Sequence, residues 1–194
     1  MRFLLLVRAM GIAHEAEAVV GHALASVHAG DEKLASRKVA SGILPTILVS
    51  SSAFHASGPL PVSSTADGEG VPPALTWEGV PDRARSIALV CEDPDAPFPE
   101  PFVHWLVYDL PATARTLGGS TPLPGKEGKN SKLATGFIGA APPVGHGIHH
   151  YHFQIFALDG ALDLAPGIGR GDLLDAMKGH VLAFGELVGT YERK

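Results

Sequence analysis

Cys-Glu-Asp-Pro-Asp-Ala-Pro, residues 91–97, is the stretch around which this sequence is organised. It closes one apolar run, Ser86–Cys91, and precedes a second, Val103–Leu110. A third run, His150–Leu158, follows the histidine-rich segment 145–151. Runs that stay apolar without a break are typical of strands with both faces covered. We therefore expect three strands whose ends bring carboxylates and histidines together in one small polar pocket.

Length and composition narrow the class of protein. The 194 residues are 45% hydrophobic and 18% charged, which suits one globular domain with an appendage. The net charge of −5 leaves no basic excess for phosphate-backbone contacts, so we expect no nucleic-acid partner. The single cysteine, Cys91, excludes an internal disulfide and a multi-cysteine zinc site. Its apolar surroundings in sequence favour a buried, inert thiol.

The first 40 residues have a helical period. Apolar residues recur at steps of three and four and form a stripe along one face: Leu5, Ala9, Ile12, Ala16, Val19, Ala23 and Val27. This stripe must be covered either by the chain's own domain or by a second copy in a homodimer. The opening apolar run ends at Arg8, too early for a signal peptide. No run approaches the ~20 apolar residues of a membrane helix. We expect a cytoplasmic protein without a transmembrane segment.

From Ile47 onward, short strands separated by Gly, Pro, Ser and Asp replace the helical pattern. One clear helix is expected at Asp172–Lys178, followed by a strand at Val181–Tyr191. This pattern predicts a mainly β fold of two packed sheets with few short helices. We accordingly divide the chain into a helical N-terminal extension, residues 1–45, and a β domain, residues 46–194.

The segment 91–97 presents two carboxylates on stiff backbone. Pro94 and Pro97 each remove a donor and push the preceding residue out of the helical region. Asp93 and Asp95, two residues apart on an extended segment, would point the same way unless a turn intervenes. The alternative is a purely structural turn whose Asp side chains accept hydrogen bonds from nearby backbone N–H groups.

Histidines supply the complementary groups. His104 begins a buried strand, where a lone histidine is either a core residue or a functional one. His149 and Tyr151 share one face of the third strand, and His150 lies on the other. Imidazoles, an Asp and a Tyr hydroxyl can hold a phosphate or carboxylate, bind a metal, or act as an acid and base pair. Spacing alone does not decide among these.

These motifs resemble those of a known family. Pro-Ala-Leu-Thr-Trp at 73–77, the Asp-Pro-Asp-Ala-Pro of 93–97, Phe-Val-His-Trp at 102–105 and the segment 142–153 are similar, in this order, to the phosphatidylethanolamine-binding proteins. The likeness covers roughly residues 50–193 and is strongest to the bacterial, Raf-kinase-inhibitor-like branch. The resemblance implies a β-sandwich domain with a small anion pocket. The ligand-binding residues expected from it and from the segment above are Asp93, Asp95, His104, Pro142, Pro143, His149 and Tyr151.

The resemblance favours a protein that binds a small phosphate-like anion, without a cofactor or metal. One alternative is a regulatory protein that inhibits a kinase or protease, with the long loop 113–141 contacting the partner. The other is a hydrolase that uses Asp93, His104 and His149. Against the hydrolase, the sequence contains neither a Gly-x-Ser-x-Gly nor a His-Glu-x-x-His motif. His150 stands where the family usually has Arg, and imidazole does not reproduce an Arg fork.

Overall fold

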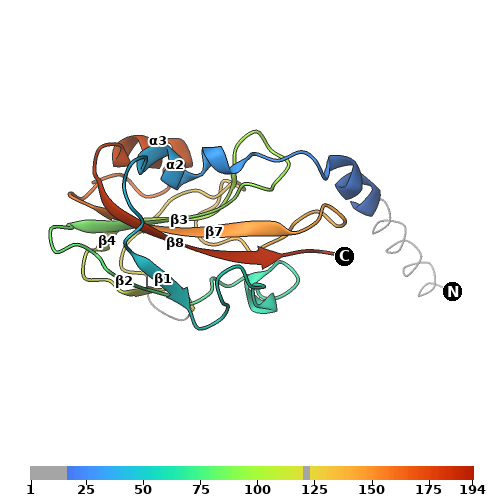
Figure 1. The fold of residues 1–194 in the computed structure, drawn as a ribbon, viewed down its shortest axis with the longest axis horizontal. Coiled ribbons are helices and arrows are strands. Elements are labelled where there is room, and N and C mark those ends of the chain that lie inside the picture. Colours follow the sequence, from blue (N-terminus) through green and yellow to red (C-terminus); the bar gives the residue numbers. More distant parts are fainter. Residues whose placement is uncertain (1–16, 120–122) are drawn as a thin grey trace.

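The computed structural model describes residues 17–119 and 123–194 and is mainly β, as predicted (Figure 1). Its strands are β1 (Leu48–Ser51), β2 (Leu75–Glu78), β3 (Ser86–Asp93), β4 (Phe102–Pro111), β5 (Thr116–Leu117), β6 (Lys126–Glu127), β7 (His149–Leu158) and β8 (Val181–Tyr191). Its short helices are η1 (Asp31–Lys33), α2 (Ala35–Val39), η2 (Val62–Ser64) and α3 (Arg170–Met177), preceded by a helical segment at 17–24.

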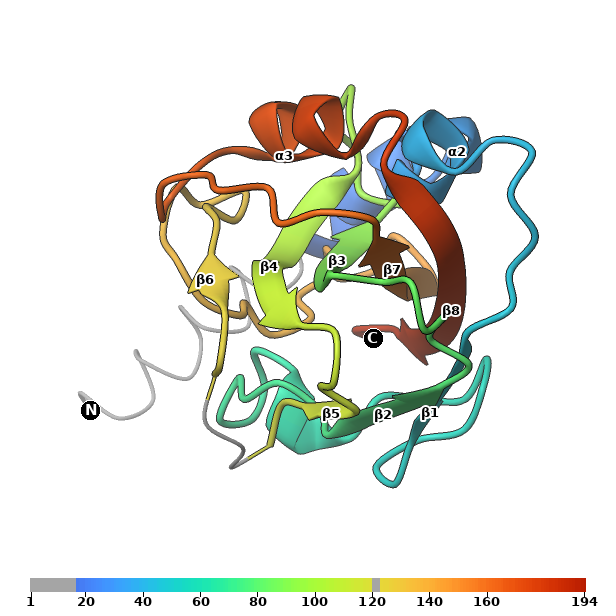
Figure 2. The same cartoon turned by 90° about the vertical axis from the view of Figure 1, so that its left-hand side faces the viewer.

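The strands form two antiparallel sheets that lie face to face (Figure 2). The larger sheet has the order β6-β4-β3-β7-β8, and the smaller has the order β1-β2-β5. Helices α2 and α3 cover the outer face of the larger sheet (Figure 2). The fold therefore has three layers, with the larger sheet buried in the middle.

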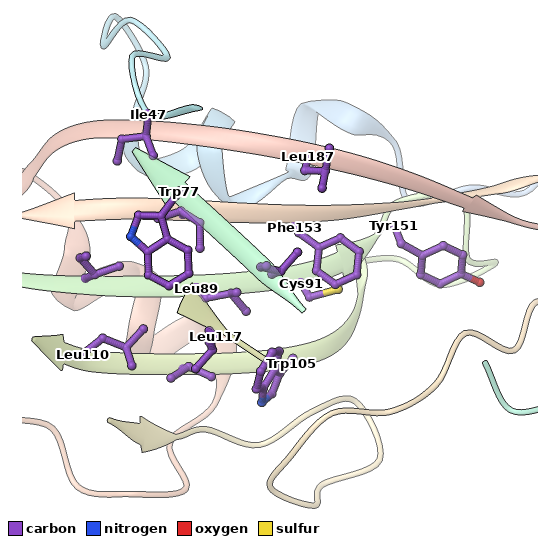
Figure 3. Packing of buried hydrophobic residues seen from close by; sticks show 14 of the residues in the cluster. Ile47, Trp77, Leu89, Cys91, Trp105, Leu110, Leu117, Tyr151, Phe153 and Leu187 are labelled. Carbon is purple, nitrogen blue, oxygen red and sulfur yellow. The ribbon is translucent and has the colours of Figure 1, made fainter. Parts of the chain in front are cut away.

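The centre of the larger sheet is apolar on both faces. On the inner face, Leu89 and Cys91 of β3 pack with Trp77 of β2 and Phe153 of β7 (Figure 3). On the outer face, neighbouring β3 residues pack against α2 and α3. Burial along all of β3 confirms that its unbroken apolar run marks a strand covered on both sides. Burial also raises the pKa of the Cys91 thiol, as expected for an inert cysteine.

One buried carboxylate holds the helical layer to the sheet. Glu92, near the end of β3, is fully buried on the helix side. Its Oε1 accepts hydrogen bonds from the backbone N–H of Ala35 in α2 and from the Gln154 amide in β7. Its Oε2 accepts from Nε of Arg170, 2.6 Å away, at the start of α3. A single side chain therefore ties both helices and two strands together.

The helical segment 17–24 contacts the domain through the face that carries Gly21, and not through its apolar stripe. In residues 17–24 the helix approaches the domain at Gly21, where a Cβ atom would overlap the carbonyl oxygen of Val144. Val19 and Val20 are 70% and 56% exposed. The chain's own domain does not cover the stripe here, and a second copy remains a prediction. Ala23 and Val27 of the stripe are exposed as well. The remaining stripe residues, Leu5, Ala9, Ile12 and Ala16, lie outside the described residues. No helix in the described ranges is long and apolar enough to span a membrane.

Removing the partner of Glu92 should destabilise the fold. We expect Arg170→Met to lower the free energy of unfolding by about 3–5 kcal/mol, because it leaves a buried carboxylate without its cation. Lys178→Met is the matched control, since Lys178 forms an exposed pair with Asp175 and should change stability by less than about 1 kcal/mol. Urea unfolding measures both. A stable Arg170→Met variant would show that this ion pair does not hold the layers together.

Candidate functional site

The polar residues singled out in the sequence meet at one end of the larger sheet. Antiparallel pairing places the end of β3 beside the starts of β4 and β7, with Asp93 opposite Phe102 and Glu92 opposite His152. A cavity of about 260 Å³ opens at this point. It is lined by all but one of the predicted ligand-binding residues: Asp93, His104, Pro142, Pro143, His149 and Tyr151.

His149 is held between two partners inside the cavity wall. Its Nδ1 donates to Oδ2 of Asp93 at 2.7 Å, and its Nε2 lies 2.7 Å from Nδ1 of His146. All three side chains are buried. Both ring nitrogens of His149 are therefore engaged by the protein, so this residue sets the charge and shape of the cavity without offering a free nitrogen to a ligand.

His104 and Tyr151 face the cavity with unused polar atoms. Nδ1 of His104 donates to the carbonyl oxygen of Ile138 at 2.7 Å, which leaves Nε2 as an acceptor in the neutral ring. Burial lowers the pKa of His104, which favours that neutral ring. The ring of Tyr151 packs edge-on against it, with the centroids 5.0 Å apart.

The Tyr151 hydroxyl is buried and, within the described part of the chain, has no hydrogen-bond partner. Figure 3 shows it pointing away from the other core side chains. Burial also raises the pKa of Tyr151, so the hydroxyl keeps its proton and remains a donor. A buried donor without an acceptor is costly, and a bound ligand would supply the acceptor.

Asp95 does not line the cavity. The backbone N–H of Asp95 donates to Oδ1 of Asp93 at 2.8 Å, which forms a tight turn and reverses the direction of the second carboxylate. Oδ2 of Asp95 instead accepts from the backbone N–H and from Nδ1 of His150, both at 2.7 Å. Asp95 therefore has the structural role that the sequence left open as an alternative, with its side chain bonded to nearby N–H groups. Asp93, in contrast, lines the cavity.

Several cavity residues had no clear signal in the sequence. Lys132 lines the cavity from the irregular loop 113–141, and its charge contributes to lowering the pKa of His104. Phe98 also had no signal; its ring lies 5.7 Å from that of Phe102, which belongs to the motif 102–105, and the two add an apolar wall. His146, which contacts His149, lies in the motif 142–153, yet its role depends on a contact that spacing does not reveal.

The lining of the cavity supplies three kinds of polar group. The cavity combines a neutral acceptor, a hydroxyl donor and a cation, and its described lining residues include no Ser, Thr or Cys nucleophile. The described residues contain no cluster of three or more metal-ligating side chains that could hold a metal ion. A larger groove of about 640 Å³ lies between α2 and β8, but it contains none of the predicted site residues.

The fold is a mainly β domain of two antiparallel sheets, with a cavity at one end that is lined by apolar residues and a few polar groups. The family model described as phosphatidylethanolamine-binding protein matches residues 50–192. The chain belongs to this family. Among curated relatives, the UPF0098 protein of Methanothermobacter thermautotrophicus is 41% identical over 147 residues, which are 73% of this chain and 95% of that protein.

Solved structures agree with this assignment. The phosphatidylethanolamine-binding protein homologue CT736 of Chlamydia trachomatis aligns with a TM-score of 0.73 and 33% identity, over 78% of this chain and 100% of that one. YbcL of Escherichia coli, described as a member of the mammalian family, aligns with a TM-score of 0.71 and 29% identity. That alignment covers 77% of this chain and 99% of that one. The sequence resemblance and the mainly β, two-sheet prediction are thus confirmed.

The Tyr151 hydroxyl predicts an unusual stability change. We expect Tyr151→Phe to raise the free energy of unfolding by about 1 kcal/mol, because it removes a buried donor that has no acceptor. Tyr108→Phe is the matched control and should lower it by about 1 kcal/mol, since the Tyr108 hydroxyl donates to the carbonyl of Ala165 at 2.6 Å. Urea unfolding without added anion measures both. A less stable Tyr151→Phe variant would show that the hydroxyl is already satisfied.

Proposed function

We propose that this protein binds a small anion, phosphate or a phosphorylated headgroup, in the cavity between β3, β4 and β7. The observation that carries the proposal is the buried hydroxyl of Tyr151, which has no acceptor among residues 17–119 and 123–194. A phosphate oxygen at this position would accept that hydrogen bond. The ammonium group of Lys132, at the exposed side of the cavity, would offset the charge of the anion.

Nε2 of His104 adds a preference for a protonated anion. As a neutral ring, Nε2 can accept a hydrogen bond from a P–OH group. As an imidazolium, it can donate a hydrogen bond to a P–O⁻ group. In either case one proton lies between the ring and the ligand. Binding should therefore tighten as pH falls from 8 to 6, because the complex holds a proton that the separate molecules release at higher pH.

The walls of the cavity indicate what the anion is attached to. Phe98, Phe102, Pro142 and Pro143 present apolar surface beside the polar groups. A volume of about 260 Å³ lies below the usual range for drug-sized ligands, so the site fits one small group rather than a whole metabolite. A phosphate ester whose organic part packs against these rings satisfies both conditions.

A protein partner is the second candidate function. Phe98 is 51% exposed at the cavity, and Leu133, next to Lys132, is 78% exposed. Exposed apolar side chains beside an anion site favour a protein ligand that presents a phosphorylated or acidic side chain. An inhibitor of a kinase or protease, the alternative that the sequence left open, would use this surface.

Phosphate titration of the full chain tests the proposal. We expect calorimetry to show binding at pH 6 that weakens at pH 8. Lys132→Met should weaken it by about fivefold, since one partly exposed charge pair contributes about 1 kcal/mol. Lys129→Met, an exposed lysine of the same loop outside the cavity, should leave the affinity within about twofold. Absence of phosphate binding at either pH would refute the proposed function.

A further inference from the structure

A chain of hydrogen bonds runs from the cavity to the N-terminal helix. Oδ2 of Asp93 pairs with His149, and His149 pairs with Nδ1 of His146. Nε2 of His146 then lies 2.8 Å from the carbonyl oxygen of Leu24, the last residue of the helical segment 17–24. The cavity wall is therefore connected, through two imidazole rings, to a segment outside the matched family region of 50–192.

This chain requires one more proton than its members hold at neutral charge. Three hydrogen bonds need three protons, one in each contact. A carboxylate and two neutral imidazoles supply only two, because each neutral ring carries one N–H. The fully bonded chain therefore holds one extra proton, shared among Asp93, His149 and His146. It has a net charge of zero, whereas the two-proton form has a charge of −1.

The carbonyl of Leu24 imposes this requirement. A carbonyl oxygen only accepts, so Nε2 of His146 must carry a proton. Water in the same place can either donate or accept, and would remove the requirement. The position at the C-terminal end of a helix also favours a cation, because the last carbonyls carry partial negative charge. Docking of the helix is therefore linked to proton uptake.

We propose that docking of the N-terminal helix strengthens anion binding in the cavity. Through its contact with His146, the docked helix favours the extra proton in the chain of Asp93, His149 and His146. The inference rests on the proposed function of the cavity. Asp93 in its two-proton chain would repel an entering anion, and the extra proton cancels that charge. By reciprocity, a bound anion favours the docked helix. His146 is accordingly a positioning residue that links the two.

The groups around the chain agree with this linkage. His146 faces His149 of β7, with Asp93 of β3 beyond it, and the ring of His28 packs edge-on at 5.6 Å. His22 of the helix lies against the neighbouring Gly145. Burial and the nearby His149 lower the pKa of His146, so the extra proton is held weakly until an anion enters.

The test uses a pair of matched substitutions in the helix. At Gly21 there is no room for a Cβ atom against Val144, so Gly21→Leu should prevent the helix from docking there. Because Leu is a good helix former, the helix itself should stay formed. Ala23→Leu makes a similar change on the exposed side and is the control. A third variant, His146→Leu, breaks the chain directly whether or not the helix moves.

Phosphate calorimetry in two buffers of different ionisation enthalpy measures affinity and the number of protons taken up. We expect Gly21→Leu and His146→Leu to bind phosphate about tenfold more weakly at pH 7. This is the typical effect of losing one charge-assisted hydrogen bond. Both should take up fewer protons than wild type, by as much as about one. Ala23→Leu should match wild type in both quantities. The proton that phosphate itself contributes is common to all variants and cancels in the comparison.

Hydrogen exchange of residues 17–30 reports docking independently, and phosphate should slow it in wild type but not in His146→Leu. Wild-type proton uptake in both Gly21→Leu and His146→Leu would overturn the inference while leaving the anion site intact. Failure of the wild type to bind phosphate would instead refute the proposed function, and this inference with it. The two failures are therefore distinct.

Discussion

Two adjacent carboxylates, Glu92 and Asp93, are buried at the end of β3 and face opposite sides of the sheet. Successive residues of a strand alternate between faces, so one strand end serves two layers. A buried carboxylate is tolerated only where donors surround it. Glu92 finds them in α2, α3 and β7, and Asp93 finds them in His149 and its own turn. The helical layer and the cavity therefore depend on the same point of the chain.

The parts of the fold that could be predicted are those whose cause is local in sequence. β3, β4 and β7 are largely covered on both faces, so they read as long, mainly apolar runs whose predicted bounds lie within two residues of the observed ones. His149 and Tyr151 share a face because a strand alternates. Asp95 shows the limit of this reasoning, because one hydrogen bond from its own N–H to Asp93 turns the carboxylate away.

The features that could not be predicted depend on which distant segments meet. Lys132 lies in a loop without periodicity, and only the folded path of that loop brings it beside His104. The helical period at 17–24 indicates an apolar face but not what the face contacts. The observed contact uses Gly21 instead, because close approach of two backbones needs the residue without a Cβ atom.

The cavity differs from the helical layer in how completely its polar atoms are satisfied. Around Glu92 both carboxylate oxygens have donors, which makes the contact rigid. In the cavity, His149 is fully engaged, while the Tyr151 hydroxyl and Nε2 of His104 have no hydrogen-bond partner in the part of the chain that the structure describes. Stability is thus concentrated behind the site, and the groups that a ligand would contact are the ones the fold leaves without partners.

The N-terminal segment is joined to the domain by two attachments of different kinds. The backbone N–H groups of Ala35 and Ser36 donate to Glu92 and Gln154, and both bonds involve buried groups whose donors do not titrate. Leu24 is joined through His146, which can bond to Leu24 and His149 at the same time only when the chain holds the extra proton. The segment is therefore anchored at α2 by donors that do not titrate, and at its helix by a histidine that does. Because the first attachment keeps the helix close to the cavity when the second is broken, redocking needs no search by a free chain, and one proton suffices to shift the equilibrium.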